Sequence, residues 1–241
     1  MKNYKSGIES KRKIYEIAKR HFLKDGYQDA LIRDIVADAG SKLGLFTYYY
    51  DNKAAVAVEI GHELLSNVKK SIKEILSTLA LENEALLYEM VHYRCLYRCV
   101  SCRPDVDRFW NESVRLTAFE YANFDVRKEH LWALVDNMER AKFFPEVELN
   151  EEYLSVITSI SIGIEKQLYH DMSTGVLKLT FDEVADVFFE FFYSKIIADK
   201  KEVYRCIDVS RIIANRINYV VNDDLSVVLT LDPDFKIERY L

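Results

Sequence analysis

The sequence predicts an all-α protein, with a small three-helix unit at the N-terminus and a larger helical region behind it. Its composition favours long helices, because 49% of the 241 residues are hydrophobic and only seven glycines and three prolines interrupt them. Apolar residues also recur at steps of three and four along most of the chain, which is the helical period. The length suits one small domain followed by a larger one.

The N-terminal unit begins with an amphipathic helix that is expected to end at Asp25-Gly26, because glycine readily adopts the left-handed conformation that ends helices. A second short helix is predicted over residues 32–39, where apolar side chains are spaced to pack on the first. The turn at Gly40-Ser41 precedes a third helix over residues 42–49, which the Ser41 hydroxyl is expected to cap. Two short helices joined by such a turn are typical of a helix-turn-helix.

One ordered set of residues runs through this unit without a gap. It consists of Ile14, Ala18, Phe22, Gly26-Tyr27, Ile32-Arg33-Asp34-Ile35, Ala39-Gly40, Gly44, Phe46, Tyr49-Tyr50 and Lys53. With this set, residues 14–53 resemble the N-terminal domain of the TetR (tetracycline repressor) family of transcriptional regulators. The sequence departs from the family pattern at Ala30-Leu31, where threonines are usual, at Ser41-Lys42, where valine and serine are usual, and at Thr47, where tyrosine is usual.

The resemblance implies a helix-turn-helix DNA-binding domain over residues 1–52 and a larger helical effector-binding and dimerisation domain over residues 53–241. It also implies a homodimer that binds a near-palindromic, double-stranded operator, most simply as a repressor released by an unknown small-molecule effector. The alternative outside the class of transcriptional regulators is a dimeric binding module that no longer binds DNA. By position, the resemblance assigns DNA contact to Lys42, Leu43, Gly44, Leu45, Thr47 and Tyr48, and phosphate contact to Lys53.

The distribution of charge agrees with a DNA-binding N-terminus. Residues 1–55 carry eleven Lys or Arg against seven Asp or Glu, whereas the rest of the chain carries 22 against 32. A basic patch on an acidic protein is what phosphate binding requires. The basic lead over residues 1–13 either lies along phosphate as an arm or is a solvated terminus. Leu43 and Leu45 cannot hydrogen-bond base edges, so direct readout there would be contact with thymine methyl groups.

C-terminal to Lys53, several residues that typically end or begin helices divide the helical pattern. Pro104 disfavours helix at the residue before it, Asn150 is a suitable cap, and Thr180 with Glu183 forms a capping-box pattern. A strand is predicted over residues 225–231. This strand would pair with a dimer mate, pair with residues 235–241, or remain unpaired. The predicted helices cover residues 54–78, 82–102, 105–121, 126–143, 151–170, 180–199 and 205–221.

Two late helices carry apolar stripes that would suit a dimer interface or an ordinary intramolecular core. The resemblance favours the interface. The residues assigned to it are Tyr153, Ile157, Ile160, Ile164, Phe188, Phe191 and Phe192.

The central helices are expected to hold an effector pocket with aromatic walls and polar anchors. The strongest candidates for effector contact are Tyr97, Trp110 and Arg115. Four further residues of the same kinds are considered with them: Arg94, Arg98, Phe119 and Trp132.

Cys95, Cys99 and Cys102 lie with His92 at steps of three and four on one predicted helix. A thiol- or metal-responsive regulator is one interpretation of this cluster. Reduced cysteines that act as small buried hydrophobic residues are the other, and no CxxC pair supports a metal site.

We find no glycine-rich phosphate loop, G-x-S-x-G elbow or H-E-x-x-H zinc motif in the sequence. The sequence therefore predicts neither an enzyme nor a cofactor or metal requirement. No apolar run reaches the roughly 18 residues of a membrane span, and no signal-peptide core is present, so a cytoplasmic protein is expected.

Overall fold

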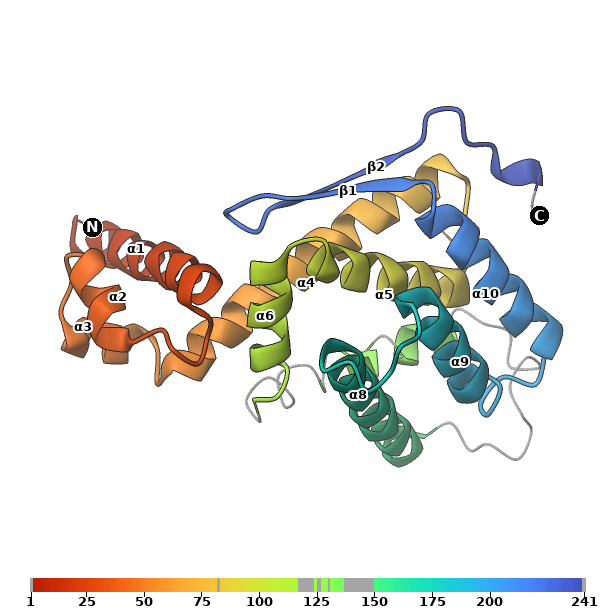
Figure 1. Cartoon of the computed structure of the whole chain (residues 1–241), viewed down its shortest axis with the longest axis horizontal. Coiled ribbons are helices and arrows are strands. Elements are labelled where there is room, and N and C mark those ends of the chain that lie inside the picture. The colour runs from red at the N-terminus through yellow and green to blue at the C-terminus, as the bar shows by residue number, and fades with distance from the viewer. Residues whose placement is uncertain are drawn as a thin grey trace.

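The computed structural model describes residues 2–81, 83–116, 124, 127–129, 131–136 and 150–239. The described part is helical apart from one small two-stranded sheet, as expected for the all-α class (Figure 1). Its elements are α1 (Lys2–Asp25), α2 (Ile32–Asp38), α3 (Leu43–Tyr49), α4 (Lys53–Thr78), α5 (Ala85–Ser101), α6 (Pro104–Ser113), α8 (Glu151–Ser173), α9 (Phe181–Tyr193), α10 (Lys200–Ala214), β1 (Ile217–Val221), β2 (Val227–Leu231) and the 3-10 helix η2 (Ile237–Arg239).

The helices α1, α2 and α3 form a compact unit at one end of the molecule, which we call the head (Figure 1). Its core consists of apolar residues from all three helices, among them Phe22, Ile35 and Phe46. Gly26 has a φ of +90° and its N–H bonds to the Phe22 carbonyl, so this glycine ends α1 as expected. α1 begins at Lys2, so the basic lead continues the helix.

The predicted cap of α3 is wrong. Lys42 occupies the N-cap position and provides no side-chain hydrogen bond to the helix. The buried Ser41 hydroxyl makes no hydrogen bond to any described residue. The reason is that Ser41 lies one residue too early, because α3 begins at Leu43 and not at Lys42.

We call the rest of the chain, from α4 onward, the core. The long helix α4 extends from the head into the core, where one apolar face of the helix is buried (Figure 1). α5 runs through the middle of the core and packs against α4, α6, α9, α10 and β1. This central position explains why α5 carries so few exposed side chains.

Three sequence signals at helix ends are confirmed. Pro104 is the first residue of α6. The Asn150 side chain accepts a hydrogen bond of 2.8 Å from the Tyr153 N–H at the start of α8. Thr180 and Glu183 form a reciprocal capping box at the start of α9.

The C-terminal part differs from the prediction in two ways. α9 ends at Tyr193, and the helix predicted over residues 205–221 is α10 followed by β1. β1 and β2 form an antiparallel hairpin, with Val221 opposite Val227, so the predicted strand pairs within its own chain. Residues 217–221 alternate between buried and exposed positions, and this period of two overrides the helical pattern there.

The predicted helices over residues 105–121 and 126–143 lie partly outside the described residues, as does Phe119. Within the described part, residues 127–129 and 131–136 are helical.

Candidate DNA-binding surface and buried pocket

The outer face of α3 is the exposed surface of the helix-turn-helix. Leu43 is 57% exposed and Tyr48 is 79% exposed, whereas Phe46 is fully buried and holds α3 on the head. Lys42 and Gly44 are also exposed, and Leu45 is half-buried against the core of the head. The geometry therefore presents most of the residues assigned to DNA contact to solvent, on one short helix.

The polar groups on this face are few. The Thr47 hydroxyl donates to the carbonyls of Leu43 and Gly44 at 3.4 and 3.2 Å, so its single proton is used within α3. Lys42 lines a shallow depression beside the start of α3 together with Lys13 of α1. These two lysines offer positive charge beside the start of α3.

Lys53, the other predicted DNA contact, is half-buried at the start of α4, where it faces the segment between α1 and α2. Its ammonium donates three hydrogen bonds, of 2.6, 3.1 and 3.0 Å, to the carbonyls of Tyr27, Gln28 and Ala30. The ammonium also lies 4.5 Å from the centre of the Tyr27 ring. These contacts lock the segment between α1 and α2 onto the start of α4. Phosphate contact by Lys53 stays a prediction.

α6 connects the head to the core. The Phe109 ring stacks on the Phe22 ring of α1, with centroids 5.9 Å apart. Arg108 donates to the carbonyls of Leu23 and Lys24 at 2.7 and 2.8 Å, where a cation complements the C-terminal end of α1. Glu112 accepts a hydrogen bond of 2.9 Å from the Gln28 N–H. One turn and a half of α6 thus contact the end of α1 and the loop after it.

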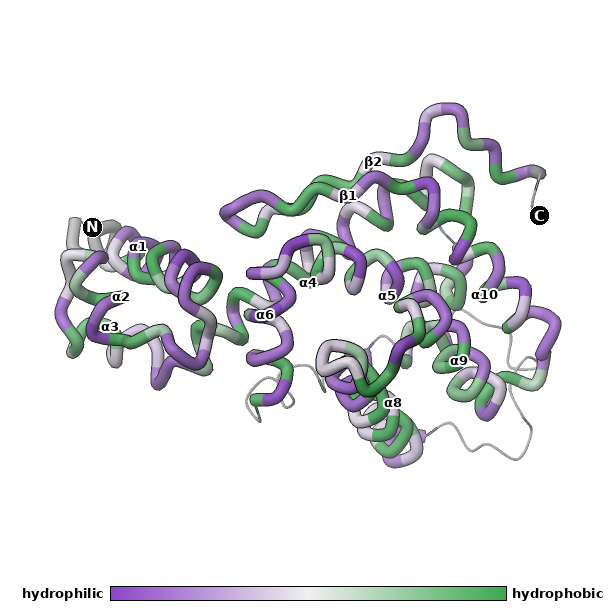
Figure 2. The backbone as a smooth tube through the Cα atoms, in the orientation of Figure 1, coloured by the Kyte–Doolittle hydropathy of each residue, from purple (hydrophilic) through white to green (hydrophobic). Residues whose placement is uncertain are grey.

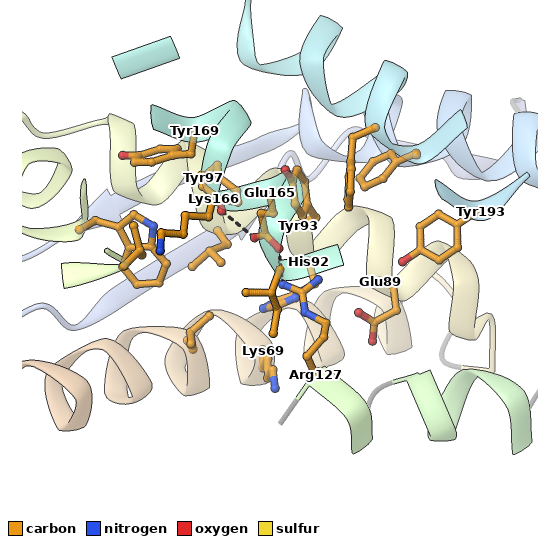
Figure 3. A pocket seen from close by; sticks show the side chains of 17 residues that line it. Lys69, Glu89, His92, Tyr93, Tyr97, Arg127, Glu165, Lys166, Tyr169 and Tyr193 are labelled. Atoms are coloured by element: carbon orange, nitrogen blue, oxygen red, sulfur yellow. Dashed lines mark hydrogen bonds and ion pairs between the residues drawn. The ribbon is translucent and has the colours of Figure 1, made fainter. Parts of the chain in front are cut away.

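A pocket lies between α4, α5, α6, α8 and α9 (Figure 3). The centres of water molecules can occupy about 80 Å³ of this cavity, which is enough room for several waters or a small molecule. Most of the wall is aromatic. The aromatic lining consists of Tyr93, Tyr97, Trp110, Tyr169, Phe188, Phe189 and Tyr193.

The polar end of the pocket is organised around Glu165 of α8. Tyr97 donates a hydrogen bond of 2.6 Å to one of its oxygens, and Arg127 lies 2.5 Å from the other (Figure 3). Although burial opposes the charge on Arg127, Glu165 and Glu89 raise the pKa of its guanidinium. Burial, together with the Glu165 charge, holds the pKa of the Tyr97 phenol well above its usual value. The Tyr97 phenol therefore stays protonated and donates to Glu165.

Lys69, Glu89 and Lys166 also line this pocket. Burial raises the pKa of the Glu89 carboxyl, although Arg127 and Lys69 favour its charged form. Burial likewise lowers the pKa of the Lys69 ammonium, against the opposing influence of Glu89. The pocket thus combines a flat apolar wall with acidic and basic groups that a small molecule can reach.

Tyr97 and Trp110 line this pocket, whereas Arg115 is exposed and is not among the lining residues. Effector contact by these three residues stays a prediction. Arg94 is fully buried elsewhere, where it pairs with Asp182 and Asp186 of α9. Trp132 and Arg98 also lie outside the lining.

Glu165 and Arg127 were not among the predicted residues. A signal for Glu165 exists in α8, where Thr158, Ser161, Glu165 and Tyr169 are buried at steps of three and four. Buried polar residues need hydrogen-bond partners, so this polar stripe on α8 indicates a helix face that lies against a polar cavity. Arg127 has no comparable signal, because its partner is 38 residues away in the chain.

The apolar stripes of α8 and α9 are divided between the inside and the outside. Ile157, Phe188 and Phe192 are buried within the chain itself, so their side chains are already covered without a partner. The dimer interface stays a prediction. Ile160 and Phe191 are exposed, at 44% and 56%. The assigned Tyr153 and Ile164 are half-buried, and Val156 and Val187 extend the exposed apolar face.

The cysteines do not gather into a metal site in the described part of the chain. Cys95 and Cys99 are fully buried, and burial raises the pKa of the Cys95 thiol to about 12. Cys102 donates to the Cys99 carbonyl, and His92 lines the pocket. Buried, protonated thiols behave as small apolar side chains.

Another group, Glu84, Glu202 and Cys206, brings potential ligand atoms within 4.8 Å of one another. Arg205 lies among them, pairs with Glu84 and approaches Glu202 at 2.8 Å. Because the guanidinium already neutralises both carboxylates, this donor set fits a metal ion poorly.

A search of solved structures finds the same arrangement of helices. Full-length TylP, a TetR regulator from Streptomyces fradiae, aligns with a TM-score of 0.50 and 14% sequence identity, over 87% of this chain and 93% of TylP. The chain has the TetR fold. A γ-butyrolactone receptor described as ArpA-like aligns with a TM-score of 0.43 at 14% identity, over 87% of this chain and 98% of the receptor.

The sequence similarity to known proteins covers a smaller part of the chain than the structural similarity does. No protein-family model matches the chain. An uncharacterized HTH-type transcriptional regulator of Bacillus subtilis (strain 168), YdgC, is 30% identical over 78 residues, which are 32% of this chain. The matched segment spans 40% of that relative. Among the described residues, no helix combines the length and apolar character needed to cross a bilayer.

Proposed function

We propose that the chain is a homodimeric transcriptional regulator that binds double-stranded DNA through α3 and responds to a small molecule in the core pocket. In this proposal, residues 1–52 form the DNA-binding domain, and residues 53–241 form the effector-binding and dimerisation domain. The regulator acts as a cytoplasmic repressor without enzymatic activity. The observation that carries the proposal is the exposed outer face of α3 on a head with the TetR fold.

The composition of this face defines how DNA would be bound. Leu43 and Tyr48 can contact thymine methyl groups and sugar, while Lys42 and Lys13 supply positive charge for phosphate. The face holds few free hydrogen-bond donors, so phosphate contacts contribute most of the affinity. Strong dependence on salt concentration follows, because each neutralised phosphate releases counterions.

Dimerisation would use the exposed apolar face of α8 and α9, formed by Val156, Ile160, Val187 and Phe191. The two residues on each helix are four apart, so they lie on one side of the helix. A two-fold dimer would place two α3 helices about 34 Å apart, in successive major grooves of a near-palindromic operator.

Effector binding would act on the head through α6. Trp110 lines the pocket, and the adjacent Phe109 stacks on Phe22 of the head. An effector that binds more tightly when α6 has moved must weaken DNA binding. The loss of DNA-binding free energy is limited by the difference in effector-binding free energy between the two positions of α6. The aromatic wall and the Glu165–Arg127 pair suit a small molecule with a flat apolar part and at least one polar group.

The test is a mobility-shift titration of the DNA upstream of the chain's own gene, at several salt concentrations. Tyr48→Ala and Lys42→Ala are expected to lower affinity, and Lys42→Ala is expected to reduce the salt slope by about one. Lys201→Ala, on the exposed surface of α10, is the control. Equal binding by all four proteins, or no binding of any DNA by the wild type, would reject α3 as a DNA-binding surface.

The dimer is tested separately by sedimentation equilibrium. Phe191→Glu is expected to give a monomer, because it places a charge in the centre of the apolar face. Leu179→Glu, an exposed apolar residue between α8 and α9, is the matched control and should remain a dimer. A monomeric wild type would remove this part of the proposal.

A further inference from the structure

We propose that the C-terminal β-hairpin is a strap that holds the head in one position relative to the core. The hairpin consists of β1, β2 and the turn over residues 222–226. Figure 1 shows the turn end of the hairpin pointing along α4 toward α1, and Figure 2 shows this turn as hydrophilic. The proposal concerns the position of the head, and it can be tested without DNA.

The contact at the tip is made by Lys19 of α1. This side chain is only 2% exposed, and its ammonium donates a hydrogen bond of 2.9 Å to the carbonyl of Asp224. The same ammonium lies 2.8 Å from Glu63 of α4, which also accepts from the Tyr15 hydroxyl. Three elements, α1, α4 and the hairpin turn, therefore meet at one buried cation.

A buried ammonium requires partners that hold their positions. Burying a charge is costly unless hydrogen bonds and opposite charge compensate for the lost water. Glu63 supplies the nearer carboxylate at 2.8 Å, Glu16 supplies a second at 3.8 Å, and the Asp224 carbonyl fills a further donor direction. If the head swung away from the hairpin, Lys19 would lose that acceptor, and so the contact favours one position of the head.

The turn itself is shaped to reach this cation. Leu225 is fully buried at a φ of +62°, a backbone conformation that is uncommon for a residue with a branched side chain. Asp224 accepts hydrogen bonds from the N–H and hydroxyl of Ser226. These contacts fix the direction of the Asp224 carbonyl. A second anchor lies nearby, where Arg103 bonds to the Val221 carbonyl at 3.1 Å and pairs with Asp223 at 2.9 Å.

The other end of the strap is fixed to α5, behind the pocket. The Tyr219 hydroxyl of β1 donates to the Ala214 carbonyl at 2.7 Å and lies 3.5 Å from the Cys95 sulfur. Arg98 of α5 approaches the Tyr219 ring and donates to the same Ala214 carbonyl. Because Tyr93 and Tyr97 of α5 line the pocket, one helix contacts the pocket with one face and the strap with another.

The test measures the distance between head and core by double electron–electron resonance. Spin labels at Ala37→Cys in α2 and Lys201→Cys in α10 replace two exposed residues, in a Cys102→Ser background that leaves only buried cysteines. Excess unlabelled protein suppresses distances between protomers. The shortened-loop variant replaces residues 222–226 with Asn-Gly, which suits a two-residue turn between the paired Val221 and Val227.

Three point variants complete the design. Lys19→Met removes the cation, Glu63→Gln removes its charge partner but leaves the Asp224 carbonyl contact, and Lys24→Met is the control at an exposed lysine of α1. The shortened loop and Lys19→Met are each expected to widen the distance distribution at least about twofold, as for a released hinge. Lys19→Met in the shortened-loop background should add nothing further, because both changes remove one contact.

An unchanged distribution in the folded shortened-loop variant would overturn the proposal. So would equal widening by Glu63→Gln and Lys19→Met, because the hairpin contact would then be irrelevant. If circular dichroism shows that the shortened loop does not fold, the comparison of these two point variants decides. A wild type that binds no DNA would reject the proposed function and leave the strap standing, because the strap is judged by the distance distribution alone.

Discussion

Besides the helix α4, two contacts of different chemistry join the head to the core. At α6, a fully buried Phe109 stacks on Phe22, and the polar groups around this pair bond to backbone atoms near the end of α1. At the hairpin turn, the contact is a buried cation, Lys19, with a carbonyl and a carboxylate around it. The first attachment buries apolar surface, and the second satisfies a charge.

This difference has a mechanical consequence. Apolar contacts are not directional, so the α6 attachment tolerates sliding of the two rings as long as their surface stays covered. Hydrogen bonds to a charged group weaken steeply with distance and angle, so the hairpin attachment tolerates little movement. We therefore expect α6 to contribute most of the stability of the joint and the hairpin to contribute most of its positional precision.

The largest effect is expected from Phe109→Ala. Truncating a buried phenylalanine costs about 3–5 kcal/mol of unfolding free energy, because burial is lost and a cavity remains. Chemical denaturation followed by circular dichroism measures this loss. Tyr48→Ala, at a residue that is 79% exposed, is the control and should change stability little. A loss below that of Lys19→Met would reverse the proposed ranking of the two attachments.

Gly26→Ala is expected to cost less. Gly26 has a φ of +90°, which costs a residue with a Cβ about 1–2 kcal/mol. An added Cβ would also meet the Glu112 carboxylate at 3.2 Å, so this side chain must give way by a few tenths of an ångström. Gly44→Ala is a matched control, because nothing lies within 4 Å of an added Cβ there and alanine favours helix. Thermal melting of the two variants should move in opposite directions, and equal destabilisation would contradict the local account.

The sequence predicted the head better than the strap for a physical reason. Gly26 and the apolar spacing around Phe22 and Ile35 are local signals, because the residues that pack together lie within one short segment. The hairpin depends on partners far away in the chain, such as Lys19, which lies 205 residues before Asp224. Residues 217–221 continue a helical apolar pattern, and only pairing with residues 227–231 makes them a strand.

The pocket shows the same limit. Tyr97 and Trp110 were predictable as aromatic residues on central helices. The pairing of Glu165 with Arg127 was not, since neither residue type nor spacing specifies a partner on another helix. Burial also separated Phe188 from Phe191, although both belong to one apolar stripe of α9.

Arg108→Gln is expected to have a smaller effect than either change above. Arg108 is exposed, and its bonds to the Leu23 and Lys24 carbonyls compete with water, so about 0.5–1 kcal/mol is expected. The loss should shrink at high salt, because screening weakens the favourable charge at the end of α1. Arg115→Gln, also exposed, is the matched control. A loss that does not depend on salt would indicate that the side chain acts by packing.

The smallest expected effect is the pH dependence of the unfolding free energy that Glu89 contributes. It distinguishes the hairpin attachment from the α6 attachment, because Glu89 lies on α5. Burial raises the pKa of the Glu89 carboxyl above its unfolded value of 4.5. Its neutral form therefore stabilises the fold, and this contribution is fully present below about pH 4.5 and is lost as pH rises through the folded pKa. Glu89→Gln should lack this loss, so the wild type should fall relative to the variant as pH rises from about 4.5 toward neutral.

The measurement is the free energy of unfolding of both proteins from pH 4 to 7, with the exposed Glu74→Gln as control. Glu89 lies on α5, to which the hairpin is fixed, and not on α6. The pH effect should therefore persist in a Phe109→Ala background, because Phe109 does not line the pocket that Glu89 faces. Parallel curves for wild type and Glu89→Gln would show that the pocket carboxyl titrates alike in the folded and unfolded chain. If Phe109→Ala abolished the pH effect, Glu89 would be coupled to the α6 attachment and not to the strap.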